Sequence, residues 1–280
     1  MTERPRPKRV ARSATVVRTE QLSPAMVRVV LGGPDLAALP ELEFTDHYVK
    51  LLFAPAGAGY AWPFDPDEIR ASRPAEQWPV TRTYTIRWFD REAGELAIDF
   101  VVHGDAGLAA PWAAQARPGD EIGFFGPGGG YVPEPGAAHL LAGDEAALPA
   151  IAAALDRLPA DAEAEVYVEV AGPADELPLR VTDKTRLTWV HRGDAPYGAP
   201  LARAVRSGWT PGPNAQVFVH GNAELVRDLR RFLFVEHRLD RRAVSISGYW
   251  RTGYTEERWQ STKRELVEQM ERDEAAAAHP

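Results

Sequence analysis

Hydrophobic and polar positions alternate over short runs through the first half of the chain. The runs are separated by segments rich in glycine, proline and aspartate, such as 32–35, 54–57 and 117–120. Strands are expected at 15–18, 26–31, 49–53, 80–89, 96–102 and 121–125. Because little helix separates these strands, we expect a small closed antiparallel barrel, which leaves no exposed sheet edge.

The pattern changes near Pro133-Glu134-Pro135-Gly136, after which strands alternate with helices. Strands are expected at 139–142, 166–170, 187–190, 217–219 and 244–247, and helices at 146–158, 223–234 and 255–273. Such alternation predicts a parallel sheet with helices on both faces and a ligand site at the carboxyl ends of the strands. In helix 223–234, Arg230 is expected on the outer face.

The expected fold class is therefore β + α/β, with two domains. The first, at 1–134, is the six-stranded antiparallel barrel, preceded by a basic arm at 1–12 that is expected to be a solvated tail. The second, at 135–280, is a nucleotide-binding α/β domain that ends in a helix.

Composition excludes several classes of protein. The 280 residues carry a net charge of −8 and no cysteine. A nucleic acid or an anionic membrane is therefore not expected as a partner, and disulfides and cysteine-bound iron–sulfur clusters are excluded. No run reaches the ~18 apolar residues that a membrane span needs. The basic arm precedes no apolar stretch, so the expected compartment is the cytoplasm. The histidines show no metal-ligand spacing, so no metal site is expected.

The segment Arg82-Thr83-Tyr84-Thr85-Ile86-Arg87 carries the first candidate chemistry. On a strand, Arg82, Tyr84 and Trp88 share one face, and Thr85 lies on the other. A guanidinium can bind a diphosphate through two hydrogen bonds, a phenol ring can lie against an aromatic system, and a threonine can offer a hydroxyl. The segment favours a flat anionic cofactor; the alternative is an edge strand with a polar face.

A second candidate follows strand 96–102, which leads into Val102-His103. The next residues, Gly104-Asp105-Ala106-Gly107, form a turn before an expected helix at 108–116. A glycine turn at a helix N-terminus directs free N–H groups toward one point, which suits a diphosphate. Alternatively, Gly107 is only a turn and Trp112 only a core residue.

Three candidates lie at the expected carboxyl edge of the parallel sheet. Gly143-Asp144-Glu145 follows the first strand; the alternative is an ordinary loop in which Asp144 caps the next helix. Glu169 lies where dinucleotide folds place a ribose-binding acid, which favours NADH over NADPH; the alternative is a solvated surface side chain. Gly248-Tyr249-Trp250-Arg251 ends the last strand, where it can cover an aromatic cofactor and hold an anionic chelate, or simply pack.

Two further features lie in the expected barrel. Lys50 interrupts the apolar strand 49–53, and a lysine there usually protects a sheet edge from pairing. The segment 57–79, rich in proline, aspartate and tryptophan, is expected to be a long loop that acts as a lid or a mobile insertion.

Together these motifs resemble a known family. Arg82-Thr83-Tyr84-Thr85 resembles the R-x-Y-[ST] flavin signature of the ferredoxin-reductase superfamily. The wider set, from about Val10 to Trp259, resembles the siderophore-interacting proteins, which are flavin-dependent ferric-siderophore reductases. That set comprises 98–107, Trp112-Ala113-Ala114, Arg117-Pro118-Gly119-Asp120, Gly126-Pro127-Gly128-Gly129, 141–145, Leu148-Pro149-Ala150, 247–251, Gly253, Thr255-Glu256 and Trp259.

The resemblance implies a fold like that of ferredoxin–NADP reductase, with FAD as the cofactor and NADH or NADPH as the donor. It implies a basic substrate pocket at Lys50 and Arg251. The implied FAD contacts are Arg82, Tyr84, Thr85, Val102, His103, Asp105, Gly107 and Ala109. The implied nicotinamide site comprises Gly143, Asp144, Glu145 and Glu169, with Trp250 there or as a cover on the flavin.

The sequence departs from the family pattern at three places. Ala110 replaces a common serine, Ala146 replaces a common threonine, and the glycines of 126–130 stand where some relatives have a third basic residue. The first departure removes a side-chain hydrogen bond to phosphate. The last reduces the positive charge available to an anionic siderophore.

The resulting hypothesis is an oxidoreductase that passes electrons from NAD(P)H through FAD to a ferric siderophore and releases ferrous iron. It needs no protein ligand to iron and no catalytic residue beyond the flavin. A ferredoxin is a second candidate donor. The alternatives are a ferric-chelate-binding flavoprotein without nicotinamide turnover, and a flavin reductase whose acceptor is a quinone or a protein.

Overall fold

The computed structural model describes residues 10–102 and 107–278. The expectations for His103, Asp105 and residues 1–9 of the basic arm lie outside the described residues. The chain forms two compact units. Unit 1 comprises the residues up to Glu20, Val27–Leu42 and His47–Gly128, and unit 2 comprises Gln21–Met26, Glu43–Asp46 and the residues from Gly129 onward. The domain boundary at 134/135 stays a prediction.

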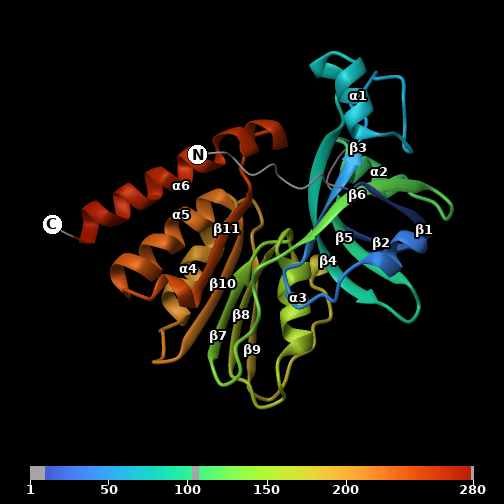
Figure 1. Ribbon diagram of the computed structural model, residues 1–280. Coiled ribbons are helices and arrows are strands. Elements are labelled where there is room, and N and C mark those ends of the chain that lie inside the picture. Colours follow the sequence, from blue (N-terminus) through green and yellow to red (C-terminus); the bar gives the residue numbers. More distant parts are fainter. Residues whose placement is uncertain (1–9, 103–106, 279–280) are drawn as a thin grey trace, which may run out of the picture. The chain divides into compact units, whose positions relative to one another are not determined.

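Unit 1 is built on a closed antiparallel barrel, as the alternating pattern predicts (Figure 1). The strands join in the order β1-β2-β5-β4-β3-β6, and β6 pairs with β1 to close the barrel. A closed barrel leaves no strand with an unpaired edge. The strands are β1 (Arg12–Ser23), β2 (Met26–Gly32), β3 (Tyr48–Phe53), β4 (Val80–Asp90), β5 (Glu95–Val101) and β6 (Glu121–Gly128).

The barrel core is filled by the inward-facing apolar residues of its strands, among them Val29, Leu51 and Ile98. Helix α2 (Ala109–Gln115) adds Ala109 and Ala113 to this core. The burial of these side chains is the main stabilising contribution to unit 1, and it fixes which face of each strand points outward.

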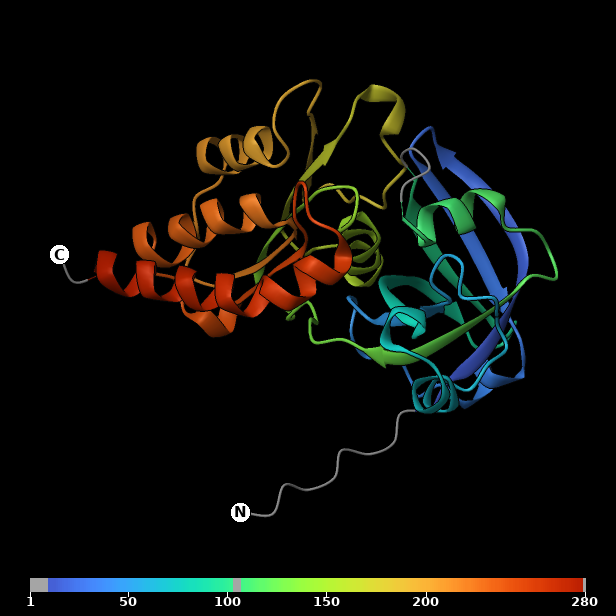
Figure 2. The same ribbon diagram turned by 90° about the horizontal axis from the view of Figure 1, so that it is seen from above.

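The segment 57–79 is ordered against the barrel, so the expectation of a plain loop is wrong (Figure 2). It contains helix α1 (Pro66–Ser72), which Asp65 caps, and the short 3₁₀ turn Ala75–Gln77. The indole of Trp62 donates to the Ser13 hydroxyl (2.9 Å) and lies over Gly123, where a Cβ atom would be 2.2 Å from the ring. Aromatic packing and local hydrogen bonds therefore fix the segment.

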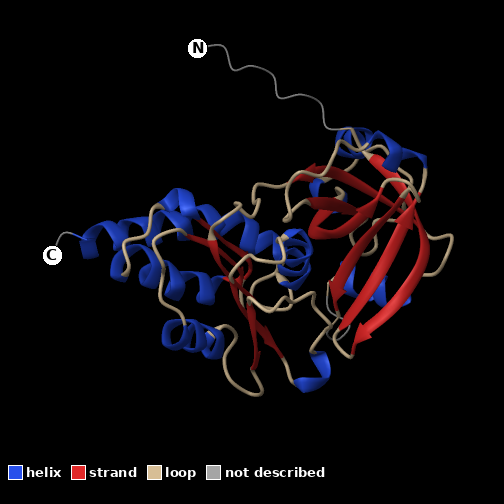
Figure 3. Cartoon of the chain, turned by 90° about the horizontal axis from the view of Figure 1, so that it is seen from below, coloured by secondary structure: helices blue, strands red, loops and turns tan. Residues whose placement is uncertain are grey.

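Unit 2 contains the expected parallel sheet, in the order β11-β10-β7-β8-β9. Helices α4 and α5 cover one face and α3 covers the other, with α6 packed outside α5 (Figures 1 and 3). The strands are β7 (Ala138–Gly143), β8 (Ala164–Val170), β9 (Thr185–His191), β10 (Ala215–Asn222) and β11 (Val244–Trp250). The helices are α3 (Leu148–Arg157), α4 (Ala199–Gly208), α5 (Ala223–Arg231) and α6 (Glu256–Ala278). Helix α4 was not predicted.

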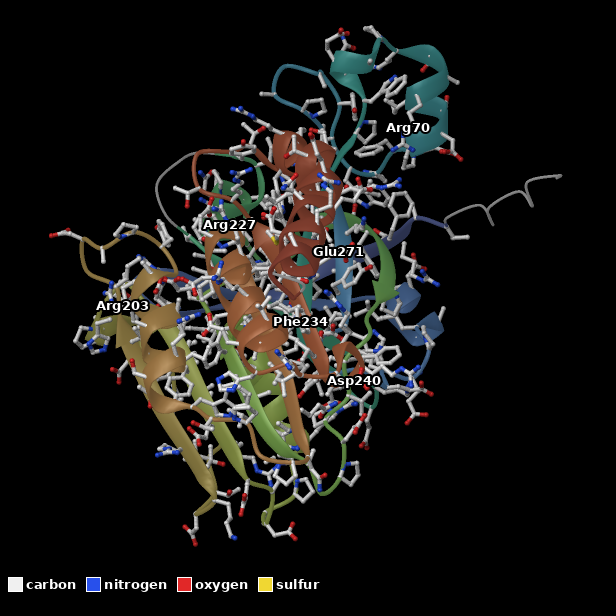
Figure 4. The ribbon with its side chains drawn as sticks, turned by 90° about the vertical axis from the view of Figure 1, so that its left-hand side faces the viewer. Arg70, Arg203, Arg227, Phe234, Asp240 and Glu271 are labelled. Atoms are coloured by element: carbon white, nitrogen blue, oxygen red, sulfur yellow. The ribbon has the colours of Figure 1, made fainter. Side chains whose placement is uncertain are left out.

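Helix α6 is attached to the outer helical layer by a buried ion pair. Glu274 accepts two hydrogen bonds from Arg230 on α5, the longer of them 3.0 Å, and one from Arg241. The guanidinium groups of Arg230 and Arg241 both lie over the ring of Phe234, 5.2 and 4.5 Å from its centre. Figure 4 shows Phe234 and the α6 residue Glu271 on this face. Arg230 is therefore buried, and its expected exposure is wrong, because α6 covers it.

Candidate functional site

Arg82, Tyr84 and Thr85 all lie on β4, one of the six strands of the barrel. Residues 80–85 of this strand pair with β3 and residues 86–90 pair with β5. Strand β4 is therefore internal in the barrel order, and the Arg82–Thr85 motif lies in the part that pairs with β3. The ring of Tyr84 packs against the core, 4.3 Å from Phe100, and Thr85 is buried. Arg82 donates to the carbonyl of Thr81 (3.0 Å). The strand therefore presents a guanidinium and a partly exposed phenol ring at fixed spacing.

A bulge reverses the face of β4 beyond this motif. Ile86 pairs with Ile98, but the next pair joins Trp88 to Ala97, so β4 contains one extra residue. Phe89 consequently packs against the barrel core with Tyr84. The prediction that Trp88 continues the Arg82–Tyr84 face is wrong, because the extra residue shifts the alternation by one position.

The turn into α2 supplies the second part of the candidate flavin site. Val102 packs against the barrel core, and Ala109 is buried in the first turn of the helix. Gly107 has a φ of +88°, which favours glycine, and a Cβ atom there would meet no atom of the described residues within 4 Å. No described side chain caps the helix, so its first N–H groups suit an anionic ligand. Trp112 is also a core residue, 5.7 Å from Phe100.

Lys50 lies in the middle of the barrel wall. Its strand β3 pairs with β4 through Thr83 and with β6 through Phe125, so the expected edge-protecting role is wrong. Its neighbours Val49 and Leu51 point into the barrel core. Alternation therefore directs the Lys50 ammonium to the outer face of the barrel.

Close packing on Tyr48, two residues before Lys50, explains why positions 126 and 128 are glycine. A Cβ atom at Gly128 would lie 2.6 Å from the phenol ring of Tyr48, and one at Gly126 would lie 3.1 Å from the Tyr48 carbonyl oxygen. Both positions pack directly on β3. A basic residue at 128 would require the Tyr48 ring to move, and one at 126 would be strained by the φ of +123°.

In unit 2, Asp144 joins three strand ends of the parallel sheet. Its side chain accepts the backbone N–H of Asn222 (2.7 Å) and of Ala146 (3.0 Å), and the indole N–H of Trp250 (2.8 Å). The bond to Ala146 lies in the turn before α3, whose N-cap is Ala147 and which has no side-chain cap, so the expected helix-capping role is wrong. Burial raises the pKa of Asp144 from 3.8 to about 7, and the three donors oppose that rise. Gly143 must be glycine, since a Cβ atom would lie 2.7 Å from the His220 carbonyl oxygen.

Glu145 and Trp250 belong to one chain of contacts along this edge. Glu145 accepts two hydrogen bonds from Arg192 (2.9 and 3.2 Å). The Arg192 guanidinium lies 3.9 Å from the centre of the Tyr197 ring, and that ring meets the indole of Trp250 edge-on at 4.7 Å. Arg192 and Tyr197 were not identified from the sequence, since neither lies in a recognised motif. Their position after β9 at the ligand edge was the only available signal.

Glu169 has a different role from the two that were expected. Its side chain is fully buried, and it accepts the backbone N–H groups of Gly198 (2.9 Å) and Leu201 (3.2 Å) at the start of α4. Arg192 lies 3.5 Å away. Burial raises the pKa of Glu169, while these three partners oppose the rise. Both the ribose-binding acid and the solvated surface side chain are wrong, and the preference for NADH loses its basis.

Arg251 lies at the end of β11 with a partner on α5. Its Nε donates to Glu224 (3.2 Å), and its guanidinium lies 4.5 Å from the centre of the Tyr254 ring. Arg258 approaches the same ring at 4.2 Å. Two guanidinium groups thus meet on one tyrosine, which concentrates positive charge beside β11.

Within residues 10–102 and 107–278, no helix combines the length and the apolar character of a membrane span. The same residues contain no group of three histidine or acidic side chains that could hold a metal ion.

The fold and these sites define a class: a flavin-binding barrel followed by a nucleotide-binding α/β unit, as in ferredoxin reductases. Residues 15–131 match the family model of the siderophore-interacting FAD-binding domain, and residues 136–253 match that of the siderophore-interacting protein. The chain belongs to the siderophore-interacting protein family, as the motifs predict.

Several relatives are similar over most of their length. An uncharacterized protein of Mycobacterium tuberculosis is 45% identical over 90% of this chain and 94% of its own. The ferric vibriobactin reductase ViuB of Vibrio cholerae is 31% identical over 90% and 94%. The NADPH-dependent ferric-chelate reductase of Escherichia coli is 32% identical over 85% and 92%. The siderophore-interacting protein SipS of Aeromonas hydrophila superposes with a TM-score of 0.81 at 31% identity, over 93% and 99%.

The residues present fit the FAD that the family implies. Arg82 offers a guanidinium of the kind that binds a diphosphate, and Tyr84 offers a ring beside Phe100. The positive φ of Gly107 and the start of α2, which no described side chain caps, suit a phosphate group. The serine missing at 110 does not affect these backbone donors.

Proposed function

We propose that the protein is a cytoplasmic flavoprotein reductase that transfers electrons from NADH or NADPH, through FAD, to a ferric siderophore and releases ferrous iron. The observation that carries the proposal is the β4 motif. Arg82, Tyr84 and Thr85 lie on an internal barrel strand, within the segment that matches the siderophore-interacting FAD-binding domain. The names of the Vibrio cholerae and Escherichia coli relatives support ferric iron as the acceptor.

In this proposal the barrel residues hold the cofactor. Arg82 and the first N–H groups of α2 bind the diphosphate, and Tyr84 lies against the flavin ring. Val102, His103, Asp105, Gly107 and Ala109 complete the contacts that family membership implies. Bound FAD would accept a hydride from nicotinamide and pass single electrons to ferric iron.

The carboxyl edge of the parallel sheet is the proposed nicotinamide site. Gly143, Asp144 and Glu145 form its first loop, and Trp250 provides a partly exposed indole at its last strand. Because Glu169 is committed to α4, it does not discriminate between NADH and NADPH. The Escherichia coli relative favours NADPH as the first donor to test.

Lys50 and Arg251 are the proposed contacts to the anionic siderophore. Their positive charges attract the chelate, and the siderophore itself supplies the iron ligands. Hard oxygen donors bind ferric iron far better than ferrous iron, so the reduction itself weakens the chelate. A ferredoxin remains a proposed alternative donor.

An anaerobic absorbance titration tests the proposal. We expect one nucleotide to bleach the flavin band of the purified holoprotein, and a ferric siderophore to restore it. A flavin that both nucleotides leave oxidised would favour an external protein donor or a ferric-chelate binder without turnover. Restoration by a quinone but by no ferric chelate would exclude the siderophore as acceptor. Protein that binds no flavin would contradict the assignment of β4.

A further inference from the structure

Asp144 is the most extensively bonded buried carboxylate at the ligand edge of unit 2. Only 1% of the residue is exposed, and its side chain accepts an N–H group from each of Ala146, Asn222 and Trp250. A carboxylate can accept all three hydrogen bonds. An amide cannot, because its own NH₂ group would face at least one of these donors.

The neighbouring strand is shaped around this carboxylate. Gly221, near the end of β10, has a φ of +131°, and a Cβ atom there would lie 2.6 Å from Cγ of Asp144. The bulge between Gly221 and Asn222 turns the next N–H group toward Asp144. The glycine and the bulge therefore both serve the contact with Asp144.

The indole of Trp250 is held at two places. Its Nε1 donates to Oδ2 of Asp144 (2.8 Å), and its ring meets that of Tyr197 at an angle of 87°. Tyr197 is itself fixed by Arg192, which Glu145 holds. A hydrogen bond at one edge and a ring contact at another restrict both the position and the tilt of the indole. Part of Trp250 remains exposed to a ligand.

We infer that Asp144 is a positioning residue for the proposed reaction: it holds the Trp250 indole in the orientation that aligns the reduced nicotinamide for hydride transfer. The inference rests on the proposed function. In this role Asp144 acts through Trp250, because its buried carboxylate already accepts three N–H groups of the protein. Its removal therefore slows hydride transfer more than it weakens nucleotide binding, because small errors in alignment reduce rate strongly.

Two measurements on the full-length holoprotein test this inference. The first is the ¹⁵N spectrum of the tryptophan indoles, of which the chain has 8; the signal lost in Trp250→Phe identifies Trp250. In the wild type, we expect this N–H group to exchange slowly with solvent. In Asp144→Ala, which removes the acceptor of the indole N–H, we expect its signal to move and its exchange to accelerate at least about tenfold, as expected when a buried hydrogen bond is lost. Asp161→Ala, at an exposed carboxylate before the amino end of β8, is the matched control.

The second measurement is the anaerobic rate of flavin reduction by the nucleotide that bleaches the wild type. We expect Asp144→Ala and Trp250→Phe each to lower the rate constant about tenfold or more, with a change in nucleotide Kd below about threefold. The double variant should be no slower than the slower single variant, because both changes remove the same interaction.

The outcomes separate the inference from the proposed function. A Trp250 indole that exchanges rapidly in the wild type overturns the inference, even if Asp144→Ala does not fold. Multiplying effects in the double variant also overturn it, because Asp144 would then act independently of Trp250. A wild-type flavin that neither nucleotide reduces contradicts the proposed function, whatever the indole spectrum shows.

Discussion

Glu169 on β8 accepts the backbone N–H of Gly198 across 2.9 Å, and through this contact the sheet caps the start of α4. Its second oxygen accepts the N–H of Leu201. We expect Glu169→Ala to leave two buried N–H groups without an acceptor and to lower the free energy of unfolding by about 2–4 kcal/mol. Urea denaturation measures this change.

The matched control is Glu163→Ala, at an exposed side chain near the amino end of β8, which should change stability by less than about 0.5 kcal/mol.

The same Glu169→Ala protein should keep the wild-type ratio of NADH to NADPH activity. A shift toward NADPH, with stability unchanged, would restore the ribose-binding interpretation.

Helices α4 and α5 show which parts of the fold the sequence makes visible. Helix α5 was predicted because its signals are local: Asn222 caps it two residues before Glu224, and apolar residues recur at helical spacing. Helix α4 was missed because its cap, Glu169, comes from a different strand, and Gly198 before it resembles a turn. A cap that depends on the tertiary fold leaves no local pattern.

The candidate site shows the same limit. Arg82, Tyr84 and Thr85 could be identified because one strand carries all three. The chain from Glu145 through Arg192 and Tyr197 to Trp250 could not, since three strand ends meet only after folding. The bulge between Ile86 and Trp88, which moves Trp88 off the expected face of β4, could not be predicted either, because the pattern of polar residues does not reveal it.

Arg82 should contribute much of the affinity for FAD. Loss of a charged hydrogen-bond donor to a diphosphate costs about 1.5–3 kcal/mol, so Arg82→Ala should weaken FAD binding about 10–100-fold. Quenching of flavin fluorescence on adding apoprotein measures the affinity. Arg18→Ala removes an exposed barrel arginine and serves as the control. Equal FAD affinity in both variants would contradict the role of Arg82.

His220 should make the protein less stable in mild acid. Burial lowers its pKa from 6.5 to about 3, so the native imidazole stays neutral. As the pH falls from 6.5 toward 3, the unfolded chain binds a proton that the native chain does not. Stability from this group therefore declines by up to about 1.4 kcal/mol per pH unit.

The variant His220→Gln should flatten that slope, as measured by urea denaturation between pH 4 and pH 6.5. Asp144, with its raised pKa, acts with the opposite sign over part of this range, so the informative quantity is the difference between variant and wild type. His191→Gln, at a partly exposed imidazole paired with Glu176, controls for loss of a histidine as such. An unchanged slope in His220→Gln would show that His220 titrates alike in both states.

Glu274 should hold α6 to the rest of unit 2. Its carboxylate and the Arg230 guanidinium are both buried, so Glu274→Gln leaves a buried charge poorly paired and should cost about 3–5 kcal/mol. Hydrogen exchange along α6 measures the local effect. Glu271→Gln, one turn earlier and 53% exposed (Figure 4), should change stability by less than about 1 kcal/mol. Equal exchange in the two variants would contradict the anchoring role.

Lys50 and Arg251 should affect the ferric substrate and leave the nucleotide half-reaction intact. Each supplies one positive charge, and loss of one charge-assisted contact is expected to raise KM for an anionic ferric siderophore about 10–100-fold. Glu224 partly neutralises Arg251, so Glu224→Gln should lower that KM. These changes should shrink at high ionic strength, because salt screens exposed charges.

Steady-state assays across a salt series test the substrate role of Lys50 and Arg251, with the rate of flavin bleaching by nucleotide as the internal reference. Lys184→Ala, at an exposed lysine paired with Glu163 near the amino end of β9, changes net charge equally and should leave KM unaltered. If Lys50→Ala and Lys184→Ala raise KM to the same degree, the rise is caused by the change in net charge and not by loss of a contact at Lys50. A rise confined to Lys50 and Arg251, with bleaching unchanged, would place the chelate at these two side chains.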